Sequence, residues 1–225
     1  MVKQQKTPVK QSFVMLCEGK ETEINYINRV LFNGYGGKQP VFNRSSTGEK
    51  ALGKLFDFRG PDTVKRGQGG RTRALIEKAL LEAEADTQTL VWCFVDGDTL
   101  IKDKIMTPER IARIKRWSNL KVCITTPCIE YWFLLHVHYT TRHFIDCDAV
   151  ALNKVKGFEK YQKNAPEEID LLYEEQAWKK AVKHANQLQN HYKVEVVTDP
   201  SFNSTNPFTA FHYFIEFLTE QSALS

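Results

Sequence analysis

Short apolar-rich runs recur along the chain, and each stops abruptly at polar residues. Such runs cover residues 12–17, 89–95, 121–125 and 193–197. Runs of this length with abrupt ends are typical of strands buried on both faces. We therefore predict a strand at each of these positions and a weaker one at residues 40–43.

Between these runs the apolar residues change to helical spacing. Within residues 21–32, for example, Ile27 and Val30 fall on one helix face. Thr72 is a suitable helix cap, and Pro108 favours a helix that starts just before it. The predicted helices cover residues 21–32, 47–56, 72–85, 107–117, 128–138, 153–162, 169–189 and 206–218.

Alternating strands and helices favour an α/β fold. We expect a mostly parallel central sheet that is flanked by helices on both faces, within one domain over residues 1–225. Its core would cover about residues 10–140, and a mainly helical C-terminal part would cover about 150–225. Sites in such folds lie at the carboxyl ends of the strands.

Composition narrows the class of protein. The chain has 225 residues, of which 42% are hydrophobic, and its longest apolar run, residues 131–137, is far shorter than a membrane span of roughly 20 residues. The polar start of the chain lacks a signal-peptide pattern, so we expect neither membrane insertion nor secretion. Three of the five cysteines, Cys17, Cys93 and Cys123, lie inside apolar runs, where free thiols are core residues. We expect a cytoplasmic protein that needs no disulfide.

Charge is distributed unevenly. Residues 1–75 hold 14 Lys or Arg and 6 Asp or Glu, whereas residues 76–225 hold 17 and 21. Such a bias favours a surface that binds a polyanion, usually nucleic acid. The alternative is an ordinary basic surface exposed to solvent. Residues 57–73, rich in glycine, arginine and lysine, read as a mobile basic loop. The candidate nucleic-acid-binding residues are Lys20, Lys65, Arg66, Arg71 and Arg73.

Acidic residues follow two of the predicted strands. Glu18 ends the first strand, and Asp96 and Asp98 end the most apolar one. Parallel pairing would bring the three carboxylates to one sheet edge, and in an extended segment Asp96 and Asp98 point to one side while Gly97 permits a turn. Converging carboxylates repel one another unless a cation neutralises them, and oxygen ligands suit Mg²⁺ or Mn²⁺. The alternative is an ordinary Asp-Gly-Asp turn beside a solvated strand end.

Four short motifs follow one another along positions 17–212. They are Cys17-Glu-Gly-Lys-Glu-Thr-Glu-Ile-Asn-Tyr26, Val95-Asp-Gly-Asp98, Thr126-Pro-Cys-Ile-Glu-Tyr-Trp-Phe-Leu-Leu-His136 and Asn206-Pro-Phe-Thr-Ala-Phe-His212. In type and order they resemble the motifs of the RloB family, also called AbiLii-like, which has a Toprim-type fold. By this resemblance Glu18 matches the Toprim glutamate, and Asp96 and Asp98 match the Asp-x-Asp pair.

The resemblance implies an activity. Toprim domains of topoisomerases, primases and overcoming-lysogenisation-defect nucleases act on phosphodiesters with Mg²⁺, the glutamate serving as acid or base and the aspartates as metal ligands. It thus implies a Mg²⁺- or Mn²⁺-dependent endonuclease of RNA, including tRNA, or of DNA, with Glu18, Asp96 and Asp98 as catalytic residues and metal ligands. Lys20 and the basic loop would stabilise phosphate charge.

The same resemblance implies partners. RloB-like proteins are implied to act in bacterial antiphage defence beside a P-loop ATPase, and this sequence has no Gly-Lys-Ser/Thr loop of its own. Nucleic acid, that ATPase and a second copy of the chain are the partners to test. The aromatic residues Tyr161, Trp178, Phe211 and Phe214 are either the docking surface for the ATPase or ordinary core.

The Pro-Cys-x-Glu motif adds Glu130 as a further catalytic candidate, with a favourable first-turn acid as the alternative. His136 lies about 120° from it around a helix, so the two do not form one ligand pair; a buried core histidine is the simpler interpretation. A zinc site of Cys123, Cys128, His136 and His138 fails because Cys123 lies within a strand.

Two other functions stay open. One is a non-catalytic nucleic-acid or effector-binding subunit of a defence complex, in which the acids have no chemical role. The other is phosphoryl chemistry on a nucleotide second messenger. Hydrolysis is favoured over strand passage because Tyr26 and Tyr131 fall on predicted helices and no second domain offers a catalytic tyrosine.

Overall fold

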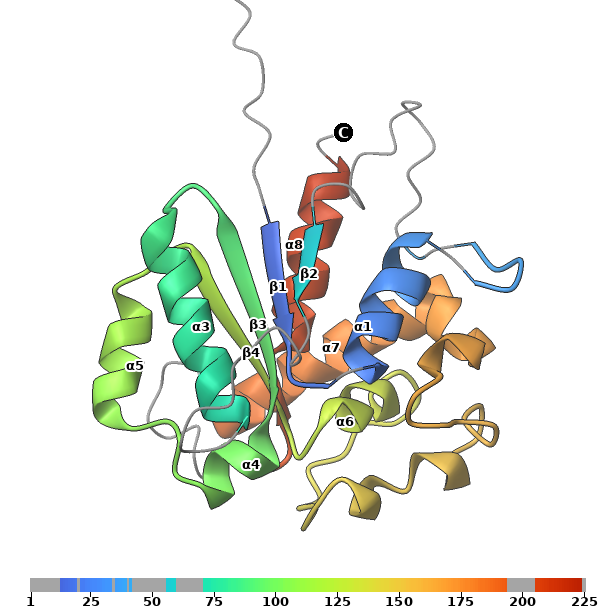
Figure 1. Cartoon of the computed structure of the whole chain (residues 1–225). Helices are drawn as coiled ribbons and strands as arrows, with labels where there is room; N and C mark the ends of the chain where they lie inside the picture. The colour runs from blue at the N-terminus through green and yellow to red at the C-terminus, as the bar shows by residue number, and fades with distance from the viewer. Residues whose placement is uncertain are drawn as a thin grey trace, which may run out of the picture.

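Strands and helices alternate along the chain in the computed structural model, which describes residues 13–19, 21–33, 35–39, 41, 56–59, 71–193 and 205–223 (Figure 1). The strands are β1 (Phe13–Cys17), β2 (Phe56–Arg59), β3 (Leu90–Asp96), β4 (Leu120–Thr126) and β5 (Phe208–Thr209). The helices are α1 (Thr22–Asn25), the π-helical η1 (Tyr26–Asn33), α3 (Arg71–Ala85), α4 (Gly97–Lys102), α5 (Pro108–Lys115), α6 (Ile129–Leu134), α7 (Glu175–Tyr192), α8 (Phe211–Ala223) and the 3₁₀ turns η3 (Asp148–Val150), η4 (Leu152–Lys154), η5 (Pro166–Glu168) and η6 (Asp170–Tyr173).

The described strands pair in the order β2-β1-β3-β4-β5. β2, β1, β3 and β4 are parallel, and the two-residue β5 runs antiparallel to β4. This confirms the predicted α/β class with a mostly parallel sheet. The carboxyl ends of β1 and β3 therefore lie side by side at one edge.

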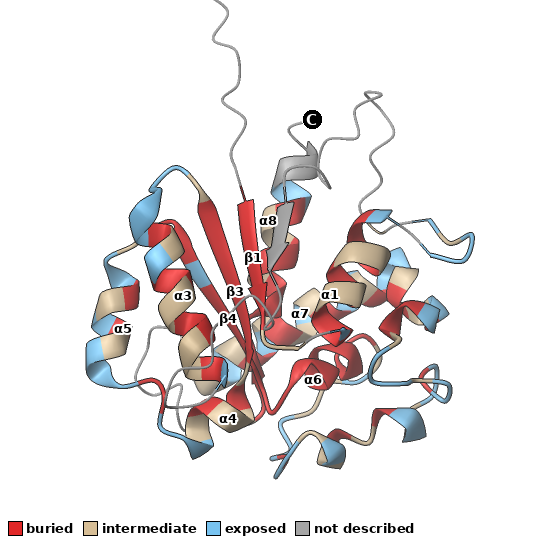
Figure 2. Ribbon diagram, in the orientation of Figure 1, coloured by how far each residue is buried: buried red, intermediate tan, exposed pale blue. Residues whose placement is uncertain are grey.

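Both faces of the sheet are covered, as the unbroken apolar runs predict. Along β1, Phe13, Met15 and Cys17 join the core on one face. Val14 and Leu16 join the core on the other face. Helices α3 and α5 pack on the Val14 side, and α6, α7 and α8 pack on the Phe13 side (Figure 1). Strands β1, β3 and β4 are buried along nearly their whole length, with Lys121 of β4 exposed, and the outer helix faces are exposed (Figure 2).

The C-terminal aromatic residues belong to this core. Phe211 and Phe214 are fully buried and pack against Phe94, with ring centroids 5.3 and 5.1 Å away. Trp178 and Tyr161 are partly buried against the same cluster. Phe211 and Phe214 are therefore core residues, whereas the docking interpretation of the partly buried Tyr161 and Trp178 stays a prediction.

Several predicted boundaries are wrong. Phe56–Arg59 form an edge strand paired with β1, where we predicted a helix end and the start of a basic loop. Residues 71–73, the end of that predicted loop, open α3. Two predicted strands, at 40–43 and 193–197, lie outside the described residues except for Val41 and Lys193. The predicted helix at 47–56 lies outside them except for Phe56, which belongs to β2.

The region after α6 contains fewer helical turns than predicted. Residues 153–162 are turns rather than a helix, and Gly157 has a φ of +92°, which right-handed helices do not allow. α7 begins at Glu175, not at 169, and α6 ends at Leu134, not at 138.

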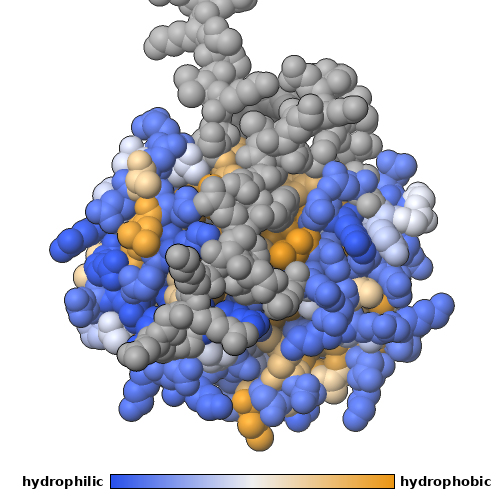
Figure 3. All heavy atoms as spheres, in the orientation of Figure 1, coloured by the Kyte–Doolittle hydropathy of each residue, from blue (hydrophilic) through white to orange (hydrophobic). Residues whose placement is uncertain are grey.

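Within the described residues, no helix is long and apolar enough to cross a membrane. On the face shown in Figure 3, hydrophilic residues predominate over the described surface.

Candidate functional site

The carboxyl ends of β1 and β3 bring Glu18 and Asp96 together. The Glu18 amide donates to the Phe94 carbonyl at 3.0 Å, which continues the strand pairing one residue further. The Asp96 amide in turn donates to Glu18 Oε2 at 3.0 Å. The parallel sheet therefore holds the two acids side by side, as the strand ends predicted.

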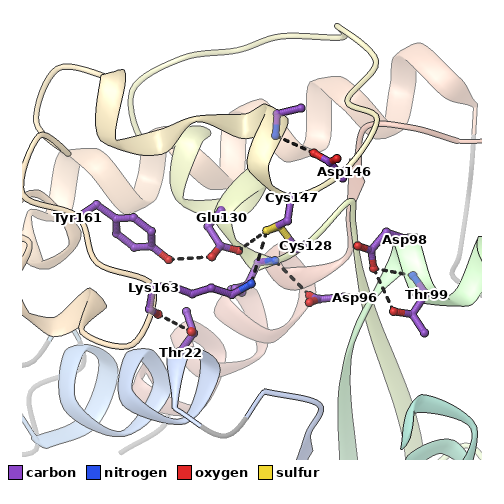
Figure 4. Close-up of a disulfide and its surroundings, with 12 residues drawn as sticks. Thr22, Asp96, Asp98, Thr99, Cys128, Glu130, Asp146, Cys147, Tyr161 and Lys163 are labelled. Atoms are coloured by element: carbon purple, nitrogen blue, oxygen red, sulfur yellow. Dashed lines mark hydrogen bonds between the residues drawn. A yellow bond between two sulfur atoms is a disulfide. The ribbon is translucent and has the colours of Figure 1, made fainter. Parts of the chain in front are cut away.

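Asp98 lies near both acids, but its geometry differs from our expectation. It is not in an extended segment with Asp96, because the chain enters α4 at Gly97. Its amide donates to the Pro127 carbonyl at 3.1 Å, and its Oδ1 accepts from the Thr99 hydroxyl at 3.2 Å (Figure 4). The carboxylate is thus held at the first turn of a short helix.

Gly97 is required by a close approach to β4 rather than by a special turn. A Cβ at this position would lie 2.0 Å from Thr126 Oγ1 and 2.8 Å from Thr126 Cβ. Atoms at such distances overlap, so an alanine would push α4 away from β4.

We expect Gly97→Ala to lower the free energy of unfolding by about 1–3 kcal/mol, because it overpacks a tight contact. Chemical denaturation measures the change. The penalty should shrink in a Thr126→Gly background, where the nearest atoms are gone and Thr126 Cα, 3.1 Å from the added Cβ, is what remains. An equal penalty in both backgrounds would contradict the contact.

Thr72 has a different part from the one predicted. It is not a helix cap but lies buried in the first turn of α3. Its hydroxyl donates to Glu18 Oε1. Both oxygens of Glu18 therefore have donors, which fixes the carboxylate while leaving each oxygen a lone pair for another partner.

Glu23 is a buried acid that the sequence reasoning missed. It is 3% exposed, and its Oε1 accepts from the Gly19 amide at 3.2 Å. A Cβ on Gly19 would lie 1.8 Å from Glu23 Oε2, so the glycine makes room for the carboxylate. A signal was present, since Glu23 shares its helix face with Ile27 and Val30 by the i, i+4, i+7 rule.

Burial and, after it, mutual repulsion raise the pKa values of the acids at this edge. Burial, followed by the charges of Glu23, Glu18, Glu130 and Asp98, raises the pKa of Asp96 well above its usual range. Burial and the charges of Glu130 and Glu18 raise the pKa of Glu23 to about 7, against hydrogen bonds that lower it. Burial is also the main reason that the pKa of Glu18 is raised. Burial and the neighbouring carboxylates therefore oppose the ionised forms of these three acids.

Of the five predicted nucleic-acid-binding residues, the structure describes Arg71 and Arg73. Arg71, exposed at the start of α3, lies close enough to Glu18 to lower the pKa of that carboxyl. Arg73 is partly buried, and its Nε has no hydrogen-bond acceptor among the described residues. Lys20, Lys65 and Arg66 lie outside the described residues.

Glu130 is buried in the first turn of α6, near the acids but turned away from Asp98 (Figure 4). Its Oε1 accepts from the Tyr161 hydroxyl at 3.0 Å, and its Oε2 lies 3.1 Å from Cys147 Sγ. The neighbouring amide of Ile129 donates to Asp96 Oδ1 at 3.2 Å, which ties α6 to the acidic edge.

The two histidines of the motifs are core residues. His136 is buried with Nδ1 3.1 Å from the Trp132 carbonyl, and burial lowers its pKa to about 4. His212 is also buried, with a pKa lowered to about 4 for the same reason. Both imidazoles are therefore neutral at pH 7.

Three of the five cysteines are free core thiols, as predicted, but the other two form a disulfide that we did not predict. Cys17, Cys93 and Cys123 are free and buried, as expected. Cys128 and Cys147, however, form a disulfide across 19 residues of sequence. Neither lies in an apolar strand run, and their pairing depends on how the segment after α6 folds back.

Possible metal ligands gather at one place in the described part of the chain. Single ligand atoms of Cys128, Glu130 and Cys147 lie within 4.8 Å of one another, and no other group of three does so among the described residues. The oxygens of Glu18, Asp96 and Asp98 lie further apart, with Asp98 turned to Thr99. A cation shared by those three would need the Asp98 side chain to turn.

Comparison with known proteins gives one result. The model of the RloB-like protein family matches residues 13–218, from the first residue of β1 into α8. No curated protein and no solved structure gives a significant match. Because the family model covers most of the chain and includes the whole acidic edge, the protein belongs to the RloB-like family.

Proposed function

We propose that this protein is a metal-dependent nuclease that hydrolyses phosphodiester bonds of RNA or DNA. The observation that carries the proposal is the cluster of Glu18, Asp96 and Asp98 at the carboxyl edge of the parallel sheet. Burial, followed by the charges of the other acids, raises the pKa of Asp96, and a bound cation would offset both effects. A groove of about 660 Å³ beside Asp98, which Lys102 and His143 help to line, gives room for a charged substrate.

The donor chemistry fits Mg²⁺ or Mn²⁺. These ions prefer carboxylate oxygens, and Glu18, Asp96 and Asp98 would hold one. A bound Mg²⁺ activates water and stabilises charge on a phosphoryl group. The Toprim-type assignment of the fold is part of this proposal and rests on the order of the motifs.

The protein groups have separate parts in the reaction. Glu18, held by Thr72 and by the Asp96 amide, would take a proton from the attacking water, and its raised pKa suits that exchange. Arg71 would stabilise the charge of the phosphate. The Ile129 amide supports the acidic edge through its hydrogen bond to Asp96, and a catalytic part for Glu130 remains a prediction.

We expect Arg71→Ala to weaken nucleic-acid binding and to reduce the salt slope of log K by about 1, because one phosphate contact is lost. Arg116→Ala is the matched control, since Arg116 is exposed at the end of α5, which leads into the amino end of β4. Binding is measured by fluorescence anisotropy at several salt concentrations. Equal effects of the two changes would remove Arg71 from the substrate path.

The test of the activity is cleavage by the purified chain. Labelled tRNA, single-stranded RNA, duplex DNA and a cyclic dinucleotide are incubated with Mg²⁺ or Mn²⁺ in parallel. Cleavage of a polymer supports the nuclease, and cleavage of the dinucleotide alone would favour second-messenger chemistry. Binding without cleavage would favour the non-catalytic subunit.

A role in antiphage defence with a P-loop ATPase is a further part of the proposal. The family membership supports it, and the chain has no nucleotide-binding Gly-Lys-Ser/Thr loop of its own. Co-expression tests it: toxicity that needs both proteins and is lost with Asp96→Asn supports a nuclease whose activity depends on the ATPase.

Light scattering of the purified chain tests whether it is a homodimer.

A further inference from the structure

Two sulfurs and one carboxylate meet at the start of α6, beside the acidic edge but facing away from Asp98 (Figure 4). Cys128 precedes the helix, Glu130 lies in its first turn, and Cys147 comes from the segment that folds back over it. Cys128 is 1% exposed and Glu130 is 5% exposed, and Cys147 is partly buried, so the cluster reaches solvent on the Cys147 side. Nothing in the proposed nuclease reaction uses the two sulfurs.

The disulfide leaves one oxygen of Glu130 without a hydrogen-bond donor among the described residues. Oε1 accepts from Tyr161, but Oε2 lies against Cys147 Sγ at 3.1 Å, and a disulfide sulfur carries no proton to donate. A buried carboxylate oxygen without a partner is costly. The position of Glu130 therefore fits a second state of the cluster, in which the sulfurs are reduced and a cation lies between them and the oxygen.

We propose that the reduced chain binds Zn²⁺ through the thiolates of Cys128 and Cys147 and through Glu130 Oε2, with water as the fourth ligand. Reduction by a thiol or a phosphine adds two electrons and two protons to the disulfide and gives two thiols. Zinc then displaces both thiol protons as the two zinc–sulfur bonds form. The disulfide and the zinc site exclude each other because they use the same sulfur atoms.

The surroundings match the charge and ligand type of such a site. Two thiolates and one carboxylate around Zn²⁺ leave one net negative charge, and Lys163 Nζ lies 3.9 Å from Cys147 Sγ, where it offsets that charge. The Tyr161 hydroxyl holds the other Glu130 oxygen and so orients the carboxylate, as outer groups commonly do in zinc sites. Thiolate ligands favour Zn²⁺ over Mg²⁺, so this site is chemically distinct from the carboxylate cluster.

The test is zinc binding by the full chain before and after reduction with a phosphine. Competition with a chromophoric chelator gives the affinity and the stoichiometry. We expect the reduced chain to bind one more Zn²⁺ tightly than the oxidised chain, because the carboxylates of Glu18, Asp96 and Asp98 are open to divalent cations in both states. Co²⁺ in place of Zn²⁺ should give a thiolate-to-cobalt charge-transfer band, and zinc should protect Cys128 and Cys147 from alkylation as identified by mass spectrometry.

Variants separate ligands from neighbours. Cys128→Ser, Cys147→Ser and Glu130→Gln should each weaken zinc binding by about 100-fold or more, and Lys163→Met by about 10-fold. Asp148→Asn is the matched control, because it removes an exposed acid next to Cys147 and should leave the affinity unchanged. Circular dichroism checks that each variant is folded, and the alkylation readout on the unaltered chain does not depend on the variants.

Equal zinc binding by the oxidised and the reduced chain, or a gain of zinc on reduction that survives the loss of both cysteines, would overturn the proposal. So would a reduced chain that shows no tight site and no charge-transfer band. None of these outcomes bears on Mg²⁺-dependent cleavage, so the zinc site and the nuclease stand or fall separately.

Discussion

Replacing Asp96 by Asn is expected to lower metal-dependent cleavage by about 10³-fold or more and, at the same time, to raise the melting temperature in EDTA. Cleavage falls because a predicted metal ligand is lost. Stability rises because burial and then the neighbouring carboxylates oppose an ionised Asp96, and each kcal/mol of this penalty that is removed raises Tm by about 2–4 °C. An asparagine oxygen still accepts from the Ile129 amide, so the tie to α6 is kept.

The control is Asp103→Asn, which neutralises an exposed acid seven residues further along the chain and should change neither quantity. Cleavage rate and thermal unfolding are measured on the same preparations. A lower Tm for Asp96→Asn in EDTA would mean that Asp96 stabilises the fold. The buried acids would then not be a group whose charge is opposed until a cation binds.

Stability in EDTA is expected to fall as the pH rises from about 4.5 to about 7, and Glu23 is a main cause. Its pKa is 4.5 in the unfolded chain and about 7 in the folded one. Between these values the folded chain keeps a proton that the unfolded chain has released, so raising the pH favours unfolding. The Glu23 contribution is about 3 kcal/mol over this window, at about 1.4 kcal/mol per pKa unit.

Denaturant titrations at several pH values in EDTA measure the effect. Glu23→Gln should flatten the pH dependence, whereas Glu21→Gln, two residues away and exposed, should leave it as it is. Part of the slope remains in Glu23→Gln because the pKa values of Asp96 and Glu18 are raised in the same direction. A stability that rises over this window in the unaltered chain would contradict the buried, repelling cluster.

The sheet and the acidic edge could be predicted because their signals are local. Unbroken apolar runs define β1, β3 and β4, and an acid directly after a parallel strand must lie at its carboxyl edge. The strand β2 was missed because four residues of alternating character give too little pattern to read. Glu23 was missed because the buried face of its helix was identified from apolar residues such as Ile27 and Val30 alone.

The region after α6 could not be predicted because long-range packing decides its structure. Apolar residues near 153–162 suggested a helix, but Gly157 adopts a left-handed φ and the segment forms turns over α6. The disulfide pairs Cys128 with a residue that only this path brings near. The position of Glu130 follows from the same packing, since Tyr161 donates to one oxygen of its carboxylate and Cys147 lies against the other.

The central claim is that the Glu18, Asp96 and Asp98 edge hydrolyses phosphodiesters with a divalent cation. The rate of cleavage of a labelled tRNA and of a duplex DNA, measured against Mg²⁺ concentration with and without the ATPase, tests it most directly. We predict no cleavage in EDTA, a rate that rises to saturation with Mg²⁺, and loss of that rate in Asp96→Asn. Cleavage that persists in EDTA, or intact substrates at every Mg²⁺ concentration with the ATPase present, would contradict it.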